Sequence, residues 1–150
     1  MTNATLMLTG EGKVQTFLPY SDYYKSAASL DTQRLGKQRV EVIQILKALT
    51  LPNYGWKNHP AIRMWHGYEW HLGIYGVAVC KTWIERGYKD TCLGKITELA
   101  SPFVGKPQAP EWLGFAPLHS SHRSNLLRKL PDHYEKFGWL EPPTLPYYLS

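Results

Sequence analysis

The 150-residue chain lacks the sequence features of secreted, membrane-spanning and disulfide-rich proteins. It contains two cysteines, Cys80 and Cys92, which are too few for a disulfide framework. No apolar run approaches the roughly 20 residues that cross a bilayer, and no basic region followed by an apolar one marks a signal peptide. We therefore expect a cytoplasmic protein without a membrane partner.

Motifs for metal, thiol and nucleotide chemistry are missing as well. The sequence has no HExxH motif, no paired CxxC motif and no glycine-rich phosphate loop. His119 and His122 could share a helix face, but two histidines do not make a metal site by themselves. Cys80 lies among apolar residues of a predicted helix, so we expect a buried, inert thiol. The sequence thus predicts no metal and no other cofactor.

The composition favours one globular domain with a basic surface. The chain is 43% hydrophobic, and its length allows a sizeable core. Lys and Arg number 17 against 12 Asp and Glu, and the resulting net charge of +5 permits a polyanionic partner. Six Trp and ten Tyr could stack on bases, although aromatic residues also fill the cores of small helical proteins.

Helix signals run along the chain, and no segment alternates long enough to predict a strand. Capping residues and apolar periodicity predict helices at about 22–29, 31–50, 58–86 with a break at Gly67, 90–100, 120–129 and 131–138. The fold class is therefore all-α, a single compact helical domain with long loops. Residues 1–13 look unlike the rest and Val14 could be a GTG start, so we expect a non-native or disordered extension before a single domain at 14–150.

The predicted helix 31–50 carries two stripes of side chains at helical spacing. The apolar stripe consists of Leu35, Val42, Ile45, Leu46 and Leu49. The polar stripe consists of Arg34, Lys37, Gln38, Glu41 and Gln44. Glu41 lies one turn from Lys37 and two turns from Arg34, where a carboxylate could act beside a bound phosphate backbone. The alternative is a solvated helix face with intrahelical ion pairs.

Two further clusters combine polar, cationic and aromatic residues. In segment 119–129, hydroxyls at a predicted helix start precede Arg123 and Lys129, and together they could bind phosphate or simply form a capped basic helix. In segment 54–60, aromatic, cationic and amide groups occupy a turn before a helix. That turn could hold a base, or a buried His and Trp could anchor it.

These clusters, in this order, resemble those of the pyrimidine-dimer DNA glycosylases of the endonuclease V type. Residues 15–20 (QTFLPY) are similar to the start of small bacterial relatives, and residues 58–60 match an NHP motif. Residues 85–91 are similar to the family's RGF/Y…DT helix end, and residues 119–139 to its basic, Tyr-rich C-terminus. The resemblance implies an all-α enzyme that flips a nucleotide out of double-stranded DNA and cleaves its N-glycosidic bond.

The resemblance also assigns roles to residues. The catalytic glutamate of the family falls on Glu41, and Asp31 on the same helix is the alternative. The residues expected to grip phosphates are Arg34, Lys37, Arg39, Arg123 and Lys129. His59 and His122 would approach the flipped nucleotide or its phosphates, and Trp56 or Trp65 would stack on a base or fill the gap.

One departure from the family concerns its nucleophile, the α-amine of a processed N-terminus. Here an initiator Met would precede Gln15, and methionine removal favours a small second residue. We therefore expect a monomeric, monofunctional glycosylase that leaves an abasic site. UV dimers, alkylated bases and modified phage bases all fit, in repair or in defence. The alternatives are a non-catalytic module that recognises modified or distorted DNA, and a regulatory domain whose charge is incidental.

Overall fold

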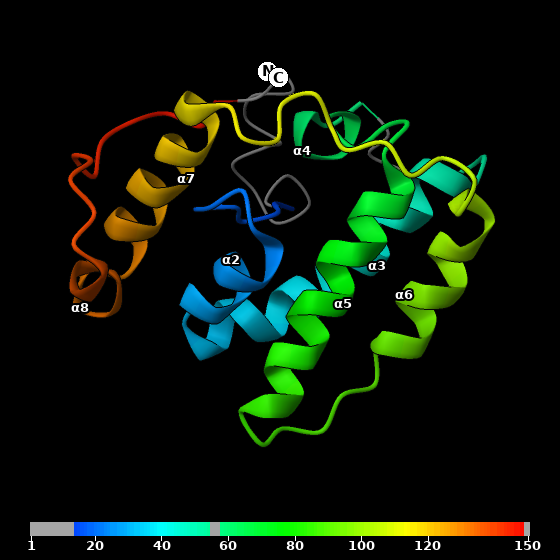
Figure 1. The fold of residues 1–150 in the computed structure, drawn as a ribbon, viewed down its shortest axis with the longest axis horizontal. Helices are drawn as coiled ribbons and strands as arrows, with labels where there is room; N and C mark the ends of the chain where they lie inside the picture. The colour runs from blue at the N-terminus through cyan, green and yellow to red at the C-terminus, as the bar shows by residue number, and fades with distance from the viewer. Residues whose placement is uncertain (1–13, 55–57, 149–150) are drawn as a thin grey trace.

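The computed structural model describes residues 14–54 and 58–148, and helices dominate both ranges (Figure 1). The α-helices are α2 (Tyr23–Ser29), α3 (Thr32–Thr50), α4 (Pro60–Arg63), α5 (Glu69–Glu85), α6 (Leu93–Ala100), α7 (Ala116–Lys129) and α8 (Pro131–Tyr134). Two 3₁₀ turns, η1 (Ser101–Phe103) and η2 (Glu135–Phe137), follow α6 and α8. No strand occurs within these ranges, and the all-α prediction is confirmed.

Aspartate caps set the starts of the first two described helices. The Asp22 carboxylate accepts a hydrogen bond from the Lys25 N–H at 2.8 Å and begins α2. Asp31 begins α3 in the same way, through the Arg34 N–H at 3.2 Å. Each cap satisfies an N–H group that has no partner inside its helix. Both helices therefore begin where the sequence predicts.

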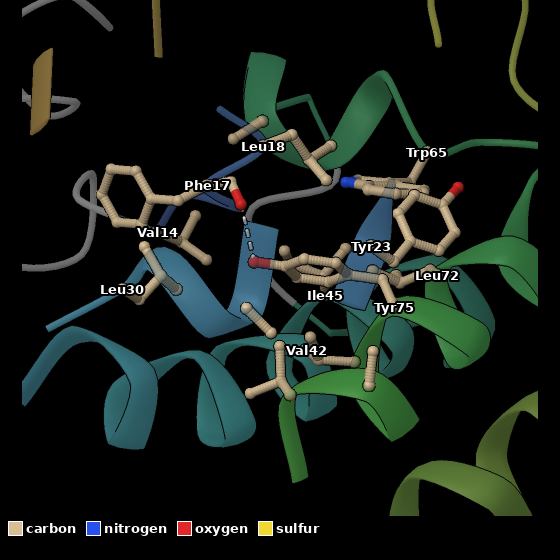
Figure 2. Close-up of a cluster of buried hydrophobic side chains, with 14 of the residues drawn as sticks. Val14, Phe17, Leu18, Tyr23, Leu30, Val42, Ile45, Trp65, Leu72 and Tyr75 are labelled. Atoms are coloured by element: carbon tan, nitrogen blue, oxygen red, sulfur yellow. Dashed lines mark hydrogen bonds between the residues drawn. The ribbon is translucent and has the colours of Figure 1, made fainter. Parts of the chain in front are cut away.

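The core forms where the N-terminal segment, residues 14–22, crosses α3 and α5 (Figure 2). Phe17 and Leu18 from this segment are buried, as are Ile45 of α3 and Tyr75 of α5. The Tyr75 hydroxyl lies 2.9 Å from the Phe17 carbonyl oxygen, so a polar contact fastens the segment to α5 inside an apolar cluster. The N-terminal segment is thus part of the core and lies against α3.

Two glycines allow α5 to pack closely on α3 and α6. A Cβ atom at Gly76 would lie 2.8 Å from Val42 Cγ1 and 2.9 Å from Ile96 Cγ2. A Cβ atom at Gly73 would lie 2.5 Å from the Cβ atom of Ala100. Since these distances are shorter than van der Waals contact, a larger residue at either position would push the helices apart. Close packing on α5 therefore fixes the middle of α3, where Glu41 lies.

The structure has the break predicted at Gly67, and it differs from the prediction at the start of α7. The break separates two helices, α4 and α5, because Gly67 has a φ of 86°, which other residues rarely adopt. Helix α7 begins at Ala116, four residues before Ser120, because Pro117 is suited to a first helical turn. Ser121 therefore lies inside α7, where its hydroxyl donates to the Leu118 carbonyl at 2.7 Å.

The C-terminal segment 141–148 runs beside α7 (Figure 1). None of the described helices is both long and apolar enough to span a bilayer.

Candidate active site

Glu41 lies on α3 and is held by a buried glutamine one turn earlier. The Gln38 side chain is fully buried, and its amide nitrogen donates to Glu41 Oε1 at 2.7 Å and to the Gln15 carbonyl at 2.7 Å. The amide oxygen of Gln38 accepts from the Phe17 N–H at 3.0 Å. It also lies 2.6 Å from the Tyr75 hydroxyl, whose single proton goes either to this oxygen or to the Phe17 carbonyl. Gln38 therefore ties the carboxylate to the N-terminal segment and to α5.

The environment of Glu41 shifts its protonation toward neutral pH. Burial raises the pKa of the carboxyl to about 7, against the lowering effects of the Lys37 charge, the Gln38 hydrogen bond and the Lys129 charge. Lys37 lies on the same helix, whereas Lys129 comes from the end of α7. A half-buried carboxyl of this kind exchanges a proton readily at neutral pH, which is what general acid–base chemistry requires.

Asp31, the second carboxylate proposed from the sequence, has a different environment. Burial alone would raise its pKa, but hydrogen bonds from Tyr134 and the Arg34 N–H, together with the charge of Arg34, hold the pKa below its usual value. The Tyr134 hydroxyl donates to Asp31 at 2.5 Å, and Arg34 forms an ion pair with it at 3.2 Å. This carboxylate stays ionised and holds the start of α3 against α8.

The cations proposed from the sequence on α3 and at the end of α7 differ in the groups that they act on. Lys37 and Lys129 act on Glu41 through their charges. Arg39 is two positions from Glu41 and so lies on nearly the opposite side of α3. There it forms an ion pair with Asp90 at 2.8 Å and covers the Trp83 ring at 4.3 Å, which joins α3 to α5 and the start of α6. Arg39 therefore has a packing role in addition to the phosphate contact proposed for it.

Arg123 does not extend freely from α7. It forms an ion pair with Glu141 at 2.6 Å and donates to the Pro19 carbonyl at 2.8 Å. The guanidinium thus joins α7 to the C-terminal segment and to the N-terminal segment at once, and a phosphate would have to compete with Glu141 for it.

The proposed DNA-contacting histidines are both engaged within the fold. His59 caps α4, where its Nδ1 accepts from the Ala61 N–H at 3.0 Å. His122 is fully buried, and its Nδ1 accepts from the Leu18 N–H at 2.8 Å. Burial and the nearby His119 lower the pKa of His122 to about 3, so the ring is neutral and carries its proton on Nε2. His122 can therefore touch DNA only if the residues that cover it, such as Tyr147 of the C-terminal segment, move away.

The tryptophans proposed to stack on a base differ in their placement. Trp65 is fully buried, donates to the Thr16 hydroxyl at 3.1 Å and packs edge-on against Trp112 with ring centroids 4.9 Å apart. Such a ring belongs to the core, and stacking on DNA would require the fold to open, contrary to the role inferred from the sequence. Trp56 lies outside the described residues.

Sequence reasoning missed Gln38, Tyr75 and Tyr147 as neighbours of Glu41. Gln38 was visible on the polar stripe of α3, but a buried glutamine and an exposed one occupy the same helical positions. Burial and the Glu41 charge raise the pKa of Tyr75, and the Glu41 charge also acts on Tyr147, which is 106 residues away in sequence. No local pattern announces such distant neighbours.

Within the described ranges, no group of three or more potential ligands is arranged to hold a metal ion.

Comparison with known proteins supplies the family. The sequence model described as pyrimidine dimer DNA glycosylase matches residues 14–95, more than half of the chain, from the N-terminal segment to the start of α6. Searches of curated proteins and of solved structures gave no match. The matched region contains Glu41, Gln38 and Tyr75, whereas α7 and the C-terminal segment lie beyond it. The chain therefore belongs to the pyrimidine dimer DNA glycosylase family.

Proposed function

We propose that this protein is a monofunctional DNA glycosylase that excises a damaged or modified pyrimidine and leaves an abasic site. The observation that carries the proposal is the environment of Glu41, a carboxyl with a pKa raised to about 7 that is aligned by Gln38 and lies in the field of the Lys37 and Lys129 charges. Membership of a family of DNA glycosylases supports the same reaction class.

In the proposed reaction, the bond between C1′ of the sugar and N1 of the base breaks, and the base leaves with the bonding electrons. A water molecule adds to C1′, and its proton passes to the Glu41 carboxylate. The departing base takes up a proton in turn. The negative charge of Glu41 also stabilises the cationic sugar that develops as the base leaves. Lys37 and Lys129 are suited to hold the flanking phosphates.

Excision assays test this proposal directly. Duplexes containing UV dimers, alkylated bases or phage-type modified pyrimidines would be incubated with the protein and scored for abasic sites. Glu41→Gln keeps the shape of the side chain and removes its charge, so excision should fall by about 10²- to 10⁴-fold. Glu98→Gln is the matched control, because Glu98 is exposed on α6. Full activity of Glu41→Gln would remove Glu41 from the mechanism.

The monofunctional assignment has its own test. A water mechanism forms no imine with the protein, so borohydride should trap no covalent protein–DNA adduct, and strand breaks should appear only after alkali. A strong trapped adduct would instead indicate a glycosylase with lyase activity. If the protein binds modified duplexes tightly and releases no base from any of them, the non-catalytic recognition module is the better description. Gene neighbourhood would separate repair from phage defence.

A further inference from the structure

The polar face of α7 binds the protein's own C-terminal segment. The Ser124 hydroxyl donates to the Pro142 carbonyl at 2.5 Å and accepts from the Leu145 N–H at 2.9 Å. The α7 side chains that bond to residues 141–148 are Ser120, Ser121, Arg123, Ser124, Asn125 and Arg128. The hydroxyl groups and the Arg123 guanidinium proposed from the sequence to bind phosphate are thus occupied by this segment.

One of these contacts has the chemistry of a phosphate site. A single oxygen of Glu141, Oε2, accepts from the Ser120 hydroxyl at 2.8 Å, from Arg123 Nε at 2.9 Å and from Arg123 Nη2 at 2.6 Å. The other carboxylate oxygen, Oε1, is buried and has no hydrogen-bond partner among the described residues. Three donors that converge on one anionic oxygen would serve a phosphate oxygen equally well. The carboxylate fills this place imperfectly, because half of it is left unsatisfied.

A second contact packs an aromatic ring against a histidine that carries a buried donor. Tyr147 packs against His122 with ring centroids 5.6 Å apart and perpendicular planes. His122 Nε2, which carries the ring proton, is buried and has no hydrogen-bond partner among the described residues. Tyr147 makes no hydrogen bond with this N–H, whereas a pyrimidine carries carbonyl oxygens that accept hydrogen bonds. The site therefore holds an unused donor that a base could satisfy.

The two contacts are made by neighbouring residues of α7. Ser120 and Arg123 are three positions apart and share one face of the helix, where they hold Glu141. His122, directly before Arg123, lies on another face and packs against Tyr147. Burial raises the pKa of the Tyr147 hydroxyl, while the charges of Arg128 and Arg34 lower it and that of Glu41 raises it. The Tyr147 ring thus lies within electrostatic range of the proposed catalytic carboxylate.

We propose that the surface covered by residues 141–148 is the subsite for the extrahelical nucleotide, in which Glu141 takes the place of a phosphate and Tyr147 the place of the pyrimidine ring. The segment must leave α7 before DNA can reach His122 and Arg123. This inference rests on the proposed glycosylase function. It follows that the segment of the free protein competes with DNA for α7. The apparent affinity for DNA is the intrinsic affinity multiplied by the fraction of molecules in which the segment is displaced.

A reversible tether tests the displacement. The contact between Ser124 Oγ and Leu145 N keeps the two Cα atoms within about 7 Å, near the longest Cα–Cα distance that a disulfide spans, so cysteines at these positions are the pair chosen for the tether. The double variant Ser124→Cys/Leu145→Cys would be titrated, oxidised and reduced, against a fluorescein-labelled duplex with one tetrahydrofuran abasic site. The oxidised form should bind at least about tenfold more weakly than the reduced form, because the disulfide lowers the fraction of molecules in which the segment has left α7. Equal dissociation constants for the two forms would overturn the inference.

Two controls keep the result interpretable. The single variant Leu145→Cys, treated with the same oxidant, should bind like the untreated protein, and circular dichroism should give the same helix content before and after reduction. A second variant does not depend on the disulfide. Glu141→Gln weakens the hold of Arg123 on the segment, so the same duplex should bind roughly three- to tenfold more tightly. Unchanged or weaker binding by Glu141→Gln contradicts the inference.

The readout also separates this inference from the proposed function. Binding is measured without excision, so a tether effect in a protein that excises no base would sustain the subsite and defeat the glycosylase proposal. Excision by a protein that shows no tether effect would sustain the glycosylase proposal and overturn the subsite.

Discussion

Replacement of Glu41 by Gln should stabilise the fold and disable excision at once, and the stabilisation should depend on pH. The folded protein raises the pKa of Glu41 to about 7 from an ordinary value of 4.5. Protonation is therefore easier in the folded chain than in the unfolded one. The contribution of this group to stability is greatest below pH 4.5, falls as the pH rises toward 7 and stays low above it. Glutamine is uncharged throughout and escapes this loss.

The magnitude follows from the size of the shift. Each unit of difference between the folded and unfolded pKa corresponds to about 1.36 kcal/mol. Ionisation of Glu41 therefore destabilises the fold by about 0.8 kcal/mol at pH 5 and about 3 kcal/mol at pH 8. Because the side chain is only half-buried, contact with solvent makes these values upper limits. The glutamine that replaces Glu41 can still accept the hydrogen bond from Gln38, so the comparison isolates the charge.

Urea denaturation at pH 5 and pH 8 measures the effect. The free energy of unfolding of Glu41→Gln should exceed that of the parent by a margin that grows with pH. Glu98→Gln, at an exposed site on α6, should give the same difference from the parent at both pH values. If Glu41→Gln and the parent lose or gain stability in parallel, the carboxyl is not buried in the way described, and its role as a tuned acid–base group loses its physical support.

Three further predictions concern Gln38, Arg123 and the chain before Gln15. Gln38→Leu leaves the buried Phe17 N–H without its acceptor, so the free energy of unfolding should drop by about 1–3 kcal/mol in urea titrations. The pH of half-maximal excision should also rise in this variant, because Glu41 loses a hydrogen bond to its charged form. Arg123→Ala should weaken binding to all DNA sequences alike and reduce the salt slope by roughly one phosphate, and an unchanged slope would count against direct contact. A chain in which Met directly precedes Gln15 should fold and act like the full one, because the family match begins at residue 14; loss of activity would implicate residues 1–13.

Sequence reasoning succeeded where the determinants are local. Asp31 was identified as a helix cap because the bond it makes joins residues three positions apart. The placement of Glu41 beside Lys37 likewise follows from helical periodicity alone. These interactions need no knowledge of the rest of the fold.

Tertiary contacts decided the roles that the sequence left open. Arg39 and Lys37 look alike in the sequence, yet only Arg39 meets a carboxylate from a distant segment, Asp90. Trp65 is a base-stacking candidate by composition and a core residue by position. The partner of Arg123, Glu141, lies 18 residues further along, beyond the reach of any helical pattern. Such assignments depend on which surfaces the fold brings together.

The hydrogen bonds of Leu18 join the family region to the part of the chain beyond it. The family match ends at residue 95, yet the backbone N–H and carbonyl of Leu18 are both bonded to histidines of α7, each at 2.8 Å. Trp112 donates to the Met64 carbonyl across the same boundary. A fragment ending at residue 95 would bury these polar groups unpaired or expose the apolar surface around them. We therefore expect that exchange of the chain at this boundary would break buried hydrogen bonds, because residues beyond the match supply partners for buried groups within it.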